Sequence, residues 1–403
     1  MRVLISGGGI AGPALAFWLH RAGAAVTIVE RAPAPRPGGH AVDVRGAARD
    51  VVEWMGLRDA IKADQVDERG WAMVNARGKR LSAMPADLFG GEGIVAEIEI
   101  ARGDLARVLH DATAADVDWR FGDQITELTT AGDVVFASGR RERYDVVVGA
   151  DGVRSAVRRL AFGPHGEFVQ PLGAYQSYFT VPDPGDLNNW FEMYNAPGGL
   201  VAGIRPERGG TAKASLSFRT KDQYGRLDKN EQIALVLKKF EKVGWRVPEM
   251  LRAMPDAADF YFDEITKVKV DNWARGRVVL IGDAGYCGTP LAGMGTSMSL
   301  VGAYVLAGEL AAAKTPEEAF AAYQREMADY VAEGTQLPPG GVEMFAPNGR
   351  LMIRMRAMSM RMMGRWPMKG LLEKQFSKAE AITLKEYGTV KDYGQLRRQM
   401  SNG

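Results

Sequence analysis

A glycine-rich turn near the start of the chain constrains its fold more than any other feature. Residues 2–6 predict a short buried strand, and the turn that follows leads into an apolar helix that stops near Gly23. Gly7 permits the tight turn, Gly9 lets the backbone approach a pyrophosphate, and Gly12 allows the helix to pack closely on the strand. The N-terminus of such a helix presents unpaired N–H groups to an anion. The segment therefore predicts the start of a parallel α/β sheet with a phosphate-binding turn.

An acidic residue at the end of the next predicted strand completes this pattern. Residues 25–29 are typical of a second strand, and Glu30 follows it, about 20 residues after the glycines. A carboxylate in this place accepts hydrogen bonds from ribose hydroxyls and disfavours a 2′-phosphate. FAD or NAD therefore fits this site better than NADP. The alternative is a glycine-rich turn in an ordinary strand–helix unit, which is less consistent with all these parts standing in register.

The composition of the chain excludes several classes of function. Its 403 residues carry 51 Lys and Arg against 49 Asp and Glu, a net charge of +2, so a concentrated basic face for nucleic acid is not expected. The single cysteine, Cys287, excludes a disulfide framework, and the 4 histidines have no metal-ligand spacing. Residues 3–5 are too short an apolar run for an export signal, and the uncharged residues 284–308 favour a buried loop and helix over a membrane span. We therefore expect a cytoplasmic protein of about two or three domains, without a metal, nucleic acid or stable membrane insertion.

Two further strand-to-helix junctions follow the first. The apolar strand at residues 144–149 leads to Asp151-Gly152, and the strand at residues 277–281 leads to Asp283 and a glycine-rich loop over 290–295. Junctions of this kind gather backbone N–H groups at one edge of a sheet. For Asp151-Gly152 a capped turn is the simpler alternative. A second glycine-rich junction so far along the chain is hard to explain by packing alone.

Between these junctions the sequence predicts a second sheet. Residues 172–219 alternate like antiparallel strands separated by turns rich in Pro, Gly and Asp. Helices are expected over 229–242 and 246–253, and a strand over 260–269. Residues 117–149 alternate like the strands of a meander.

Taken in order, these motifs resemble those of the class A flavoprotein monooxygenases, the FAD-dependent aromatic hydroxylases. The resemblance rests on residues 7–30, Arg102-Gly103-Asp104-Leu105, residues 149–155 and residues 282–295. A late Glu343-Met344-Phe345 stretch is similar to the tetracycline-inactivating branch.

The resemblance implies an α/β fold, in which a discontinuous, Rossmann-like FAD-binding domain carries an inserted, mainly antiparallel β-sheet substrate domain and C-terminal helices. The expected boundaries are 1–170 and 271–345 for the FAD-binding domain, 171–270 for the substrate domain and 346–403 for the C-terminal helical segment.

The resemblance also implies roles for individual residues. The three glycines and Glu30 would hold the ADP half of FAD, Arg102 would contact the flavin side, and Asp283 the ribityl or pyrophosphate region. Asp151-Gly152 would lie at the FAD edge and serve NAD(P)H entry, supported by Arg154. The four residues Pro290, Gly293, Met294 and Gly295 would form the catalytic environment of the flavin ring, where backbone N–H groups stabilise the reduced anion; no general base is assigned. The complete set of expected FAD contacts is Gly7, Gly9, Ile10, Ala11, Gly12, Glu30, Arg31, Arg45, Arg102, Asp151, Gly152, Arg154, Asp283, Pro290, Gly293, Met294 and Gly295.

Two departures from the family pattern bear on the substrate. After Asp283 the chain has Ala284-Gly285, where the family often has Ala-His. Glu192 and Lys213 stand where the tetracycline-inactivating branch carries a Gln and a His. These departures weigh against tetracycline itself and leave a related polycyclic phenol open. The expected polar contacts to the substrate are Tyr178, Glu192, Tyr194 and Lys213.

The activity that the resemblance implies is a single-component monooxygenase, as a monomer or homodimer. NAD(P)H, with NADPH favoured, would reduce FAD, O2 would form a flavin C4a-hydroperoxide, and its distal oxygen would go to an aromatic or polycyclic small molecule. The chain has no second complete glycine-rich nucleotide unit, so the reductant is expected to visit the FAD domain transiently. Two alternatives stay open: a flavin-dependent reductase or dehydrogenase of the same fold, and a non-catalytic flavin-binding sequestration protein.

Three features lie outside this scheme. Cys287 falls in the glycine-rich loop, but without a resolving cysteine a redox role is not favoured. A catalytic role for His40, near the expected flavin, ranks below a structural one. Residues 351–369 combine methionines with arginines, and the expected apolar helical face holds Leu351, Met355, Met358 and Met362. Packing of this helix at the domain interface is favoured over a Met-rich wall for a bulky substrate and over membrane-surface binding.

Overall fold

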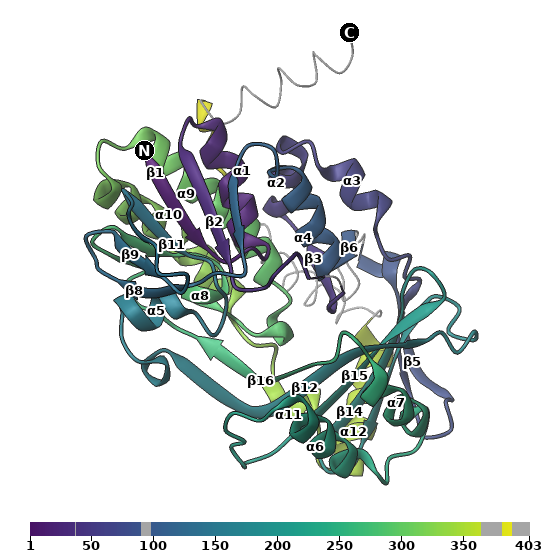
Figure 1. Ribbon diagram of the computed structural model, residues 1–403. Coiled ribbons are helices and arrows are strands. Elements are labelled where there is room, and N and C mark those ends of the chain that lie inside the picture. The colour runs from purple at the N-terminus through teal and green to yellow at the C-terminus, as the bar shows by residue number, and fades with distance from the viewer. Residues whose placement is uncertain (37, 90–97, 364–380, 389–403) are drawn as a thin grey trace.

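A six-stranded sheet forms the centre of the half of the molecule that holds the N-terminus (Figure 1). The computed structural model describes residues 1–36, 38–89, 98–363 and 381–388. The strand order is β17-β18-β11-β1-β2-β7, and all neighbouring pairs are parallel except β17 with β18. The four central strands, β18, β11, β1 and β2, are short and mostly apolar runs, as expected for strands covered on both faces. The edge strands β7 and β17 are partly exposed. Their bounds are β1 Arg2–Ser6, β2 Ala25–Glu30, β7 Asp118–Phe121, β11 Val146–Gly149, β17 Ala274–Arg275 and β18 Val278–Leu280.

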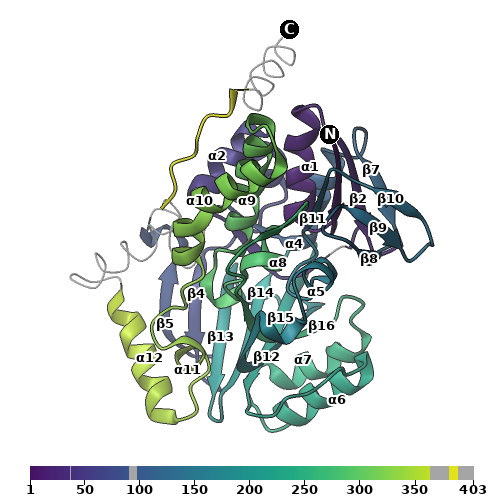
Figure 2. The ribbon, with the colours of Figure 1, turned by 90° about the vertical axis from the view of Figure 1, so that its left-hand side faces the viewer.

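Helices and a small sheet cover this parallel sheet from opposite sides (Figure 2). The long helix α9 packs against α1, α2 and α10, and it is buried from Ser297 to Leu310, which explains why residues 284–308 carry no charge. The other side carries α5 and the antiparallel sheet β8-β9-β10. Of the meander predicted over 117–149, only these three middle strands form an antiparallel meander, because β7 and β11 belong to the parallel sheet. The bounds in this half are α1 Ala11–Arg21, α2 Ala47–Trp54, α3 Arg58–Ala63, α4 Arg102–Asp111, α5 Ala156–Ala161, α8 Asp283–Tyr286, α9 Gly295–Ala312, α10 Pro316–Gly334, β3 Ala41–Val44, β6 Ile98–Ala101, β8 Ile125–Leu128, β9 Asp133–Phe136 and β10 Arg141–Arg143.

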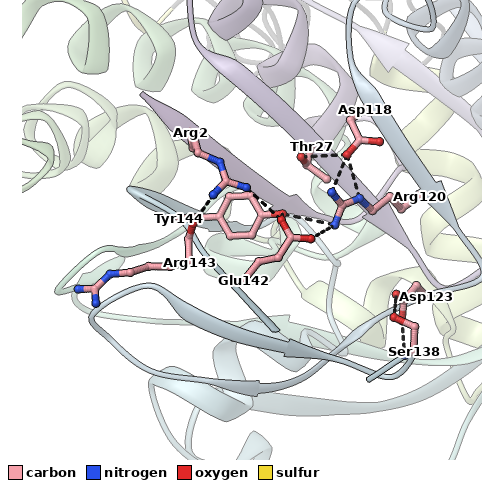
Figure 3. A network of polar contacts seen from close by, with 9 residues as sticks. All are labelled: Arg2, Thr27, Asp118, Arg120, Asp123, Ser138, Glu142, Arg143 and Tyr144. Carbon is pink, nitrogen blue, oxygen red and sulfur yellow. Dashed lines mark hydrogen bonds and ion pairs between the residues drawn. The ribbon is translucent and has the colours of Figure 1, made fainter. Parts of the chain in front are cut away.

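A polar network ties the small sheet to the parallel one (Figure 3). Arg120 of β7 contacts Glu142 of β10 at 2.5 Å, and Arg2 of β1 reaches the same carboxylate at 3.0 Å. The Tyr144 hydroxyl donates to Glu142 at 2.9 Å. Burial opposes the ionisation of Glu142, but hydrogen bonds from Arg120 and Tyr144 outweigh it and hold the pKa of this carboxyl below its ordinary value. The charged form of Glu142 therefore stabilises the junction of three strands.

The second sheet has seven strands in the order β16-β12-β15-β14-β13-β4-β5. Its neighbouring pairs are antiparallel except for β13 with β4. β4 and β5 come from residues 70–85, and the long connection between β4 and β13 is what a parallel pair requires. The predicted fold class, a parallel sheet combined with a mainly antiparallel one, is confirmed. The domain boundaries stay a prediction. The bounds are β4 Gly70–Val74, β5 Arg80–Pro85, β12 Val169–Pro182, β13 Trp190–Ala196, β14 Leu200–Pro206, β15 Thr211–Arg219 and β16 Tyr261–Val268.

The two faces of the large sheet have different neighbours. The outer face, which includes Phe179, Ile204 and Phe218, packs against α6 (Lys229–Phe240) and α7 (Val247–Ala253). The inner face, which includes Tyr178, Arg205 and Lys213, looks toward the parallel-sheet half. It contacts His40, which directly precedes β3, and Glu99 of β6. Figure 2 shows the α6–α7 pair and α12 (Arg350–Met363) on opposite sides of this sheet. The short helix α11 (Gly341–Phe345) precedes α12.

The C-terminal helix corrects one expectation. Leu351 and Met358, which share the predicted packing face, are 71% and 62% exposed, and Met355 and Met362 are exposed as well. Instead, Ala357 and Met360 pack on Trp71 and Met193 of the sheet. The helix carries apolar side chains on more than one face, so the periodicity of the sequence could not show which face packs against the sheet. The rest of the predicted segment, residues 364–369, lies outside the described residues.

A short C-terminal piece, residues 381–388, docks on α9. The Tyr387 hydroxyl donates to Glu309 at 2.8 Å, and the Tyr304 hydroxyl donates to the backbone oxygen of Lys385 at 2.9 Å. Gly308 makes room for this contact, because a Cβ at that position would lie 2.2 Å from the Tyr387 ring. Among the helices that the structure describes, none has the length and apolar character that crossing a membrane requires.

Candidate cofactor and substrate site

The predicted junctions meet at one edge of the parallel sheet. β1 pairs in parallel with both β2 and β11, and β11 pairs in parallel with β18. Since parallel strands end at the same edge, the turn after β1, Glu30, Asp151 and Asp283 are brought together there. Segments from four separate stretches of the chain therefore form a single candidate nucleotide site.

The turn after β1 has the shape of a phosphate cradle. A Cβ on Gly7, whose φ is +116°, would lie 2.4 Å from the backbone oxygen of Ala150, and one on Gly12 would lie 2.0 Å from the oxygen of Gly7. Gly9 faces open space, with Arg102 Nη2 as the nearest atom at 3.7 Å from an added Cβ. Ile10 and Ala11 begin α1, and within the described residues no side chain caps this helix. Unpaired N–H groups next to open space fit a pyrophosphate.

Glu30 closes the turn from the side of β2. Its carboxylate accepts hydrogen bonds from the backbone N–H groups of Gly8 and Ala32, both at 2.9 Å. Each carboxylate oxygen has a second acceptor position, so the group can still accept from a sugar hydroxyl. Arg31, the neighbouring predicted contact, is exposed.

Arg102 and Asp283 face each other across the site. Arg102 begins α4, and its backbone N–H donates to the His40 oxygen at 3.0 Å. The Asp283 carboxylate lies 3.7 Å from a Cβ placed on Gly295, at the start of α9. Burial raises the pKa of Asp283, while the charge of Arg102 opposes that rise. The structure thus brings Gly9, Arg102, Asp283 and Gly295 together.

The loop before α9 is strained and leaves the helix start open. Thr289 has a φ of +79°, an unfavourable value for a β-branched residue, and Gly293 follows at +69°. Pro290 is exposed and Met294 is buried, and no side chain caps the N-terminus of α9 among the described residues. The Arg45 N–H donates to Ser297 in the first turn of α9, and its guanidinium pairs with Asp43 at 2.8 Å. An uncapped helix start can stabilise an anion placed before it.

Asp151 and Arg154 are engaged by the protein itself. The Asp151 carboxylate accepts from the backbone N–H groups of Ala156 at 2.7 Å and Val157 at 3.1 Å, so it caps α5. Gly152 has a φ of +78°, and Arg154 donates to Asp263 of β16 at 2.6 Å. The capped turn considered from sequence is therefore present, and the expected role at the FAD edge stays a prediction.

Sequence reasoning missed a buried arginine near this turn. Arg158 is 1% exposed and donates to the backbone oxygen of Ala284 at 2.8 Å, which joins α5 to α8. Burial raises the pKa of the Cys287 thiol well above its ordinary value, and the charge of Asp283 adds to this effect. Cys287 is therefore a protonated, buried side chain rather than a reactive thiolate.

The inner face of the large sheet brings two predicted substrate residues to the site. Tyr178 stacks on His40 with ring centroids 4.9 Å apart. Lys213 donates to Asp259 at 2.6 Å and to the Thr180 hydroxyl at 2.7 Å. Tyr178 thus lies where the two halves of the molecule meet, and Lys213 is near enough for its charge to lower the pKa of His40.

The other two predicted substrate residues lie on the outer face. Glu192 pairs with Arg80 at 3.3 Å and lines a cavity of about 530 Å³ that also includes Trp245 and Arg246. The Tyr194 ring packs against Trp245 with centroids 6.0 Å apart. Neighbouring residues in a strand point to opposite faces of the sheet. The sequence alone did not show which residues of this strand face the parallel-sheet half. The structure does not bring Glu192 and Tyr194 together with Tyr178 and Lys213.

A buried ion cluster on the inner face was not predicted. Arg205 of β14 pairs with Glu68 and contacts Glu99 of β6 at 2.6 Å. Burial disfavours the charge of Arg205, but the two carboxylates outweigh it and raise its pKa. Burial raises the pKa of Glu99 well above its ordinary range, and the neighbouring Glu68 adds to this, although Arg205 opposes it. The partners are too far apart in the sequence for any local pattern to reveal them.

Comparison with known proteins extends over most of the chain. The model of the FAD binding domain family matches residues 1–337. An uncharacterized protein of Mycobacterium tuberculosis is 41% identical over 350 residues, covering 84% of this chain and 94% of that protein. A flavin-dependent monooxygenase of Legionella longbeachae is 38% identical over 314 residues, covering 77% of this chain and 80% of that protein. The crystal structure of tetracycline destructase Tet(51) is similar with a TM-score of 0.80 at 33% identity, over 96% of this chain and 99% of that one.

Proposed function

Because this chain belongs to the FAD binding domain family and is an FAD-dependent monooxygenase, we propose that it hydroxylates an aromatic or polycyclic phenol with NAD(P)H and O2 as co-substrates. The observation that carries this proposal is the meeting of the cofactor junctions with the inner face of the large sheet at His40 and Tyr178. A similar protein is a tetracycline destructase, which supports a polycyclic substrate class.

The residues of this chain fit the cofactor. The cradle of Gly7, Gly9 and Gly12 would hold the pyrophosphate, and Glu30 would accept from the ribose hydroxyls. Arg102 and Asp283 would lie beside the middle of the dinucleotide, and the open start of α9 beside the flavin ring. The bound flavin supplies the activation of O2 by the route that the family resemblance implies.

The protein's own contribution is to position the substrate and exclude water. The inner face offers an aromatic surface at Tyr178 and a cation at Lys213 that Asp259 holds in place. The N–H groups at the start of α9 would stabilise negative charge on the reduced ring. The reductant, with NADPH favoured, would visit the same site transiently, since the sequence has no second glycine-rich nucleotide unit.

Turnover with isotopic oxygen tests this proposal. Holoenzyme is mixed with NADPH and a panel of polycyclic phenols under 18O2, and NADPH consumption and product mass are followed. A phenol should stimulate NADPH oxidation and gain one labelled oxygen atom. A product without label would support the reductase alternative, and flavin binding with no stimulation by any phenol would support the sequestration alternative.

A further inference from the structure

His40 lies where the two halves of the molecule meet. It follows two glycines with positive φ, Gly38 at +76° and Gly39 at +100°, and its backbone oxygen accepts from the N–H of Arg102 at 3.0 Å. Its ring stacks on Tyr178, with 4.9 Å between centroids and 25° between planes. The backbone of the cofactor half therefore holds this imidazole against the substrate-facing sheet.

Among the residues that the structure describes, the ring nitrogens of His40 have no hydrogen-bond partner. The other histidines of the chain are engaged: His165 with Arg158 at 3.2 Å, His110 with Asp111 at 3.1 Å and His20 with Asp116 at 3.9 Å. Over the described ranges, His40 makes neither a ring hydrogen bond nor an ion pair, although the residue is partly buried. A polar ring placed this way is available to a ligand.

The surroundings keep this imidazole neutral. Burial lowers the pKa of His40 to about 4, and the charges of Arg102 from α4, Arg205 from β14 and Lys213 from β15 act in the same direction. Asp43 of β3 opposes them. Tyr178 of β12 stays protonated, because burial raises its pKa to about 12. At neutral pH, His40 therefore has one ring nitrogen free to accept a proton.

We propose that His40 is a catalytic residue that binds the hydroxyl group of a phenolic or enolic substrate and accepts its proton during oxygen transfer, an assignment that rests on the proposed function. The substrate O–H bond breaks, the proton goes to the unprotonated ring nitrogen, and the electron pair moves into the substrate ring as the new C–O bond forms. The O–O bond of O2 breaks: one oxygen atom forms the new C–O bond, and NAD(P)H with one proton reduces the other to water. The oxygenated carbon then loses its hydrogen as a proton, and His40 returns its own proton to the substrate oxygen as the ring becomes aromatic again.

The surrounding charges are compatible with this step. An imidazolium and a neighbouring phenolate together have no net charge. The nearby cations repel the imidazolium but attract the phenolate, so the two effects oppose each other. The three cations that act on His40 therefore oppose its protonation in the empty site more strongly than in the presence of a bound phenolate. Proton transfer to His40 is thus coupled to the presence of the substrate.

The pH profile of His40→Gln tests the assignment. Glutamine keeps a polar side chain but cannot take a proton at these pH values, so turnover near pH 7 should fall by about 100-fold. Turnover of the variant should rise again toward about pH 10, where a phenol ionises by itself, whereas the wild-type rate should be nearly flat above about pH 6. FAD content and the rate of flavin reduction by NADPH should match the wild type. A large loss that high pH does not rescue would indicate a structural role and overturn the proposal.

A binding measurement keeps the test independent of turnover. Alizarin, a hydroxylated anthraquinone, changes colour when it ionises, so its protonation state in the site can be read from its visible spectrum. Bound to wild-type holoenzyme, it should ionise at a lower pH than when bound to His40→Gln or to the smaller amide variant His40→Asn. The matched control His20→Gln, at an exposed ion pair, should behave as the wild type does. Equal ionisation in the wild type and the His40 variants would overturn the assignment even if the enzyme hydroxylates other phenols.

Discussion

A methyl group at Gly9 tests whether the turn after β1 approaches a pyrophosphate. The nearest heavy atom to an added Cβ is Arg102 Nη2 at 3.7 Å, an ordinary van der Waals distance, and the backbone there has no positive φ. Alanine therefore fits the free protein, and by restricting the unfolded chain it should leave the free energy of unfolding unchanged or raise it by about 0.4–1 kcal/mol. The same methyl would stand between the backbone and the phosphate. Loss of one N–H bond to a charged group costs about 1.5–3 kcal/mol, so FAD affinity should fall by about 10- to 150-fold.

Gly12→Ala provides the contrast. Its Cβ would lie 2.0 Å from the backbone oxygen of Gly7, so it must retreat by about 1.4 Å to reach the 3.4 Å of ordinary contact. Such overpacking lowers the free energy of unfolding by about 1–3 kcal/mol and distorts the cradle as well. Gly166→Ala is a neutral control, because no heavy atom lies within 4 Å of its added Cβ.

Two measurements on the flavin-free protein separate these effects. Urea unfolding gives the stability of each variant, and quenching of flavin fluorescence during FAD titration gives the affinity. We expect Gly9→Ala to lose affinity alone, and Gly12→Ala to lose both affinity and stability. FAD binding of wild-type strength by Gly9→Ala would refute the cradle, and an equal stability loss in both variants would refute the steric reasoning.

Three further changes test charge and packing elsewhere. Arg205→Met leaves two carboxylates buried without a cation and should lower the free energy of unfolding by about 3–5 kcal/mol. The control Arg208→Met, at an exposed ion pair, should lower it by at most about 1 kcal/mol. Equal losses of stability in urea unfolding would contradict a special role for the buried ion pairs of Arg205. Glu142→Gln should cost about 1–3 kcal/mol near neutral pH. Because the folded pKa of Glu142 lies below its ordinary value, this wild-type advantage is present above that value and should disappear as the pH falls through the folded pKa. An advantage that does not shrink as the pH is lowered would refute this link. Gly308→Ala should displace Tyr387 and raise hydrogen exchange in residues 381–388, and unchanged exchange would argue against docking of this segment.

Local patterns predicted the regular elements well. The helix expected over 229–242 forms over Lys229–Phe240, where Asp228 and Glu231 make a capping box. The strand expected over 260–269 forms over Tyr261–Val268. In these segments, neighbours in the sequence decide the structure, so the pattern suffices.

Long-range placement was harder to predict. Nothing local indicates that β4 and β5, from residues 70–85, extend a sheet whose other strands begin at Val169. Glu192 was expected at the substrate and lies on the outer face, because a shift of one residue along a strand reverses the face. Arg205 was not expected at all, since its partners Glu68 and Glu99 become visible only when distant strands meet.

The sequence by itself determined the edge of the sheet at which we propose that the cofactor binds. Gly7, Gly9, Gly12 and Glu30 act within one strand–helix–strand unit, where spacing along the chain fixes geometry. Only the tertiary structure decided which side chains face that edge from the large sheet. His40 gains its stacked partner Tyr178 and the charges of Arg102, Arg205 and Lys213 from four separate segments. The physical reason is that burial and electrostatic fields depend on distance in space, and no interval along the sequence encodes that distance.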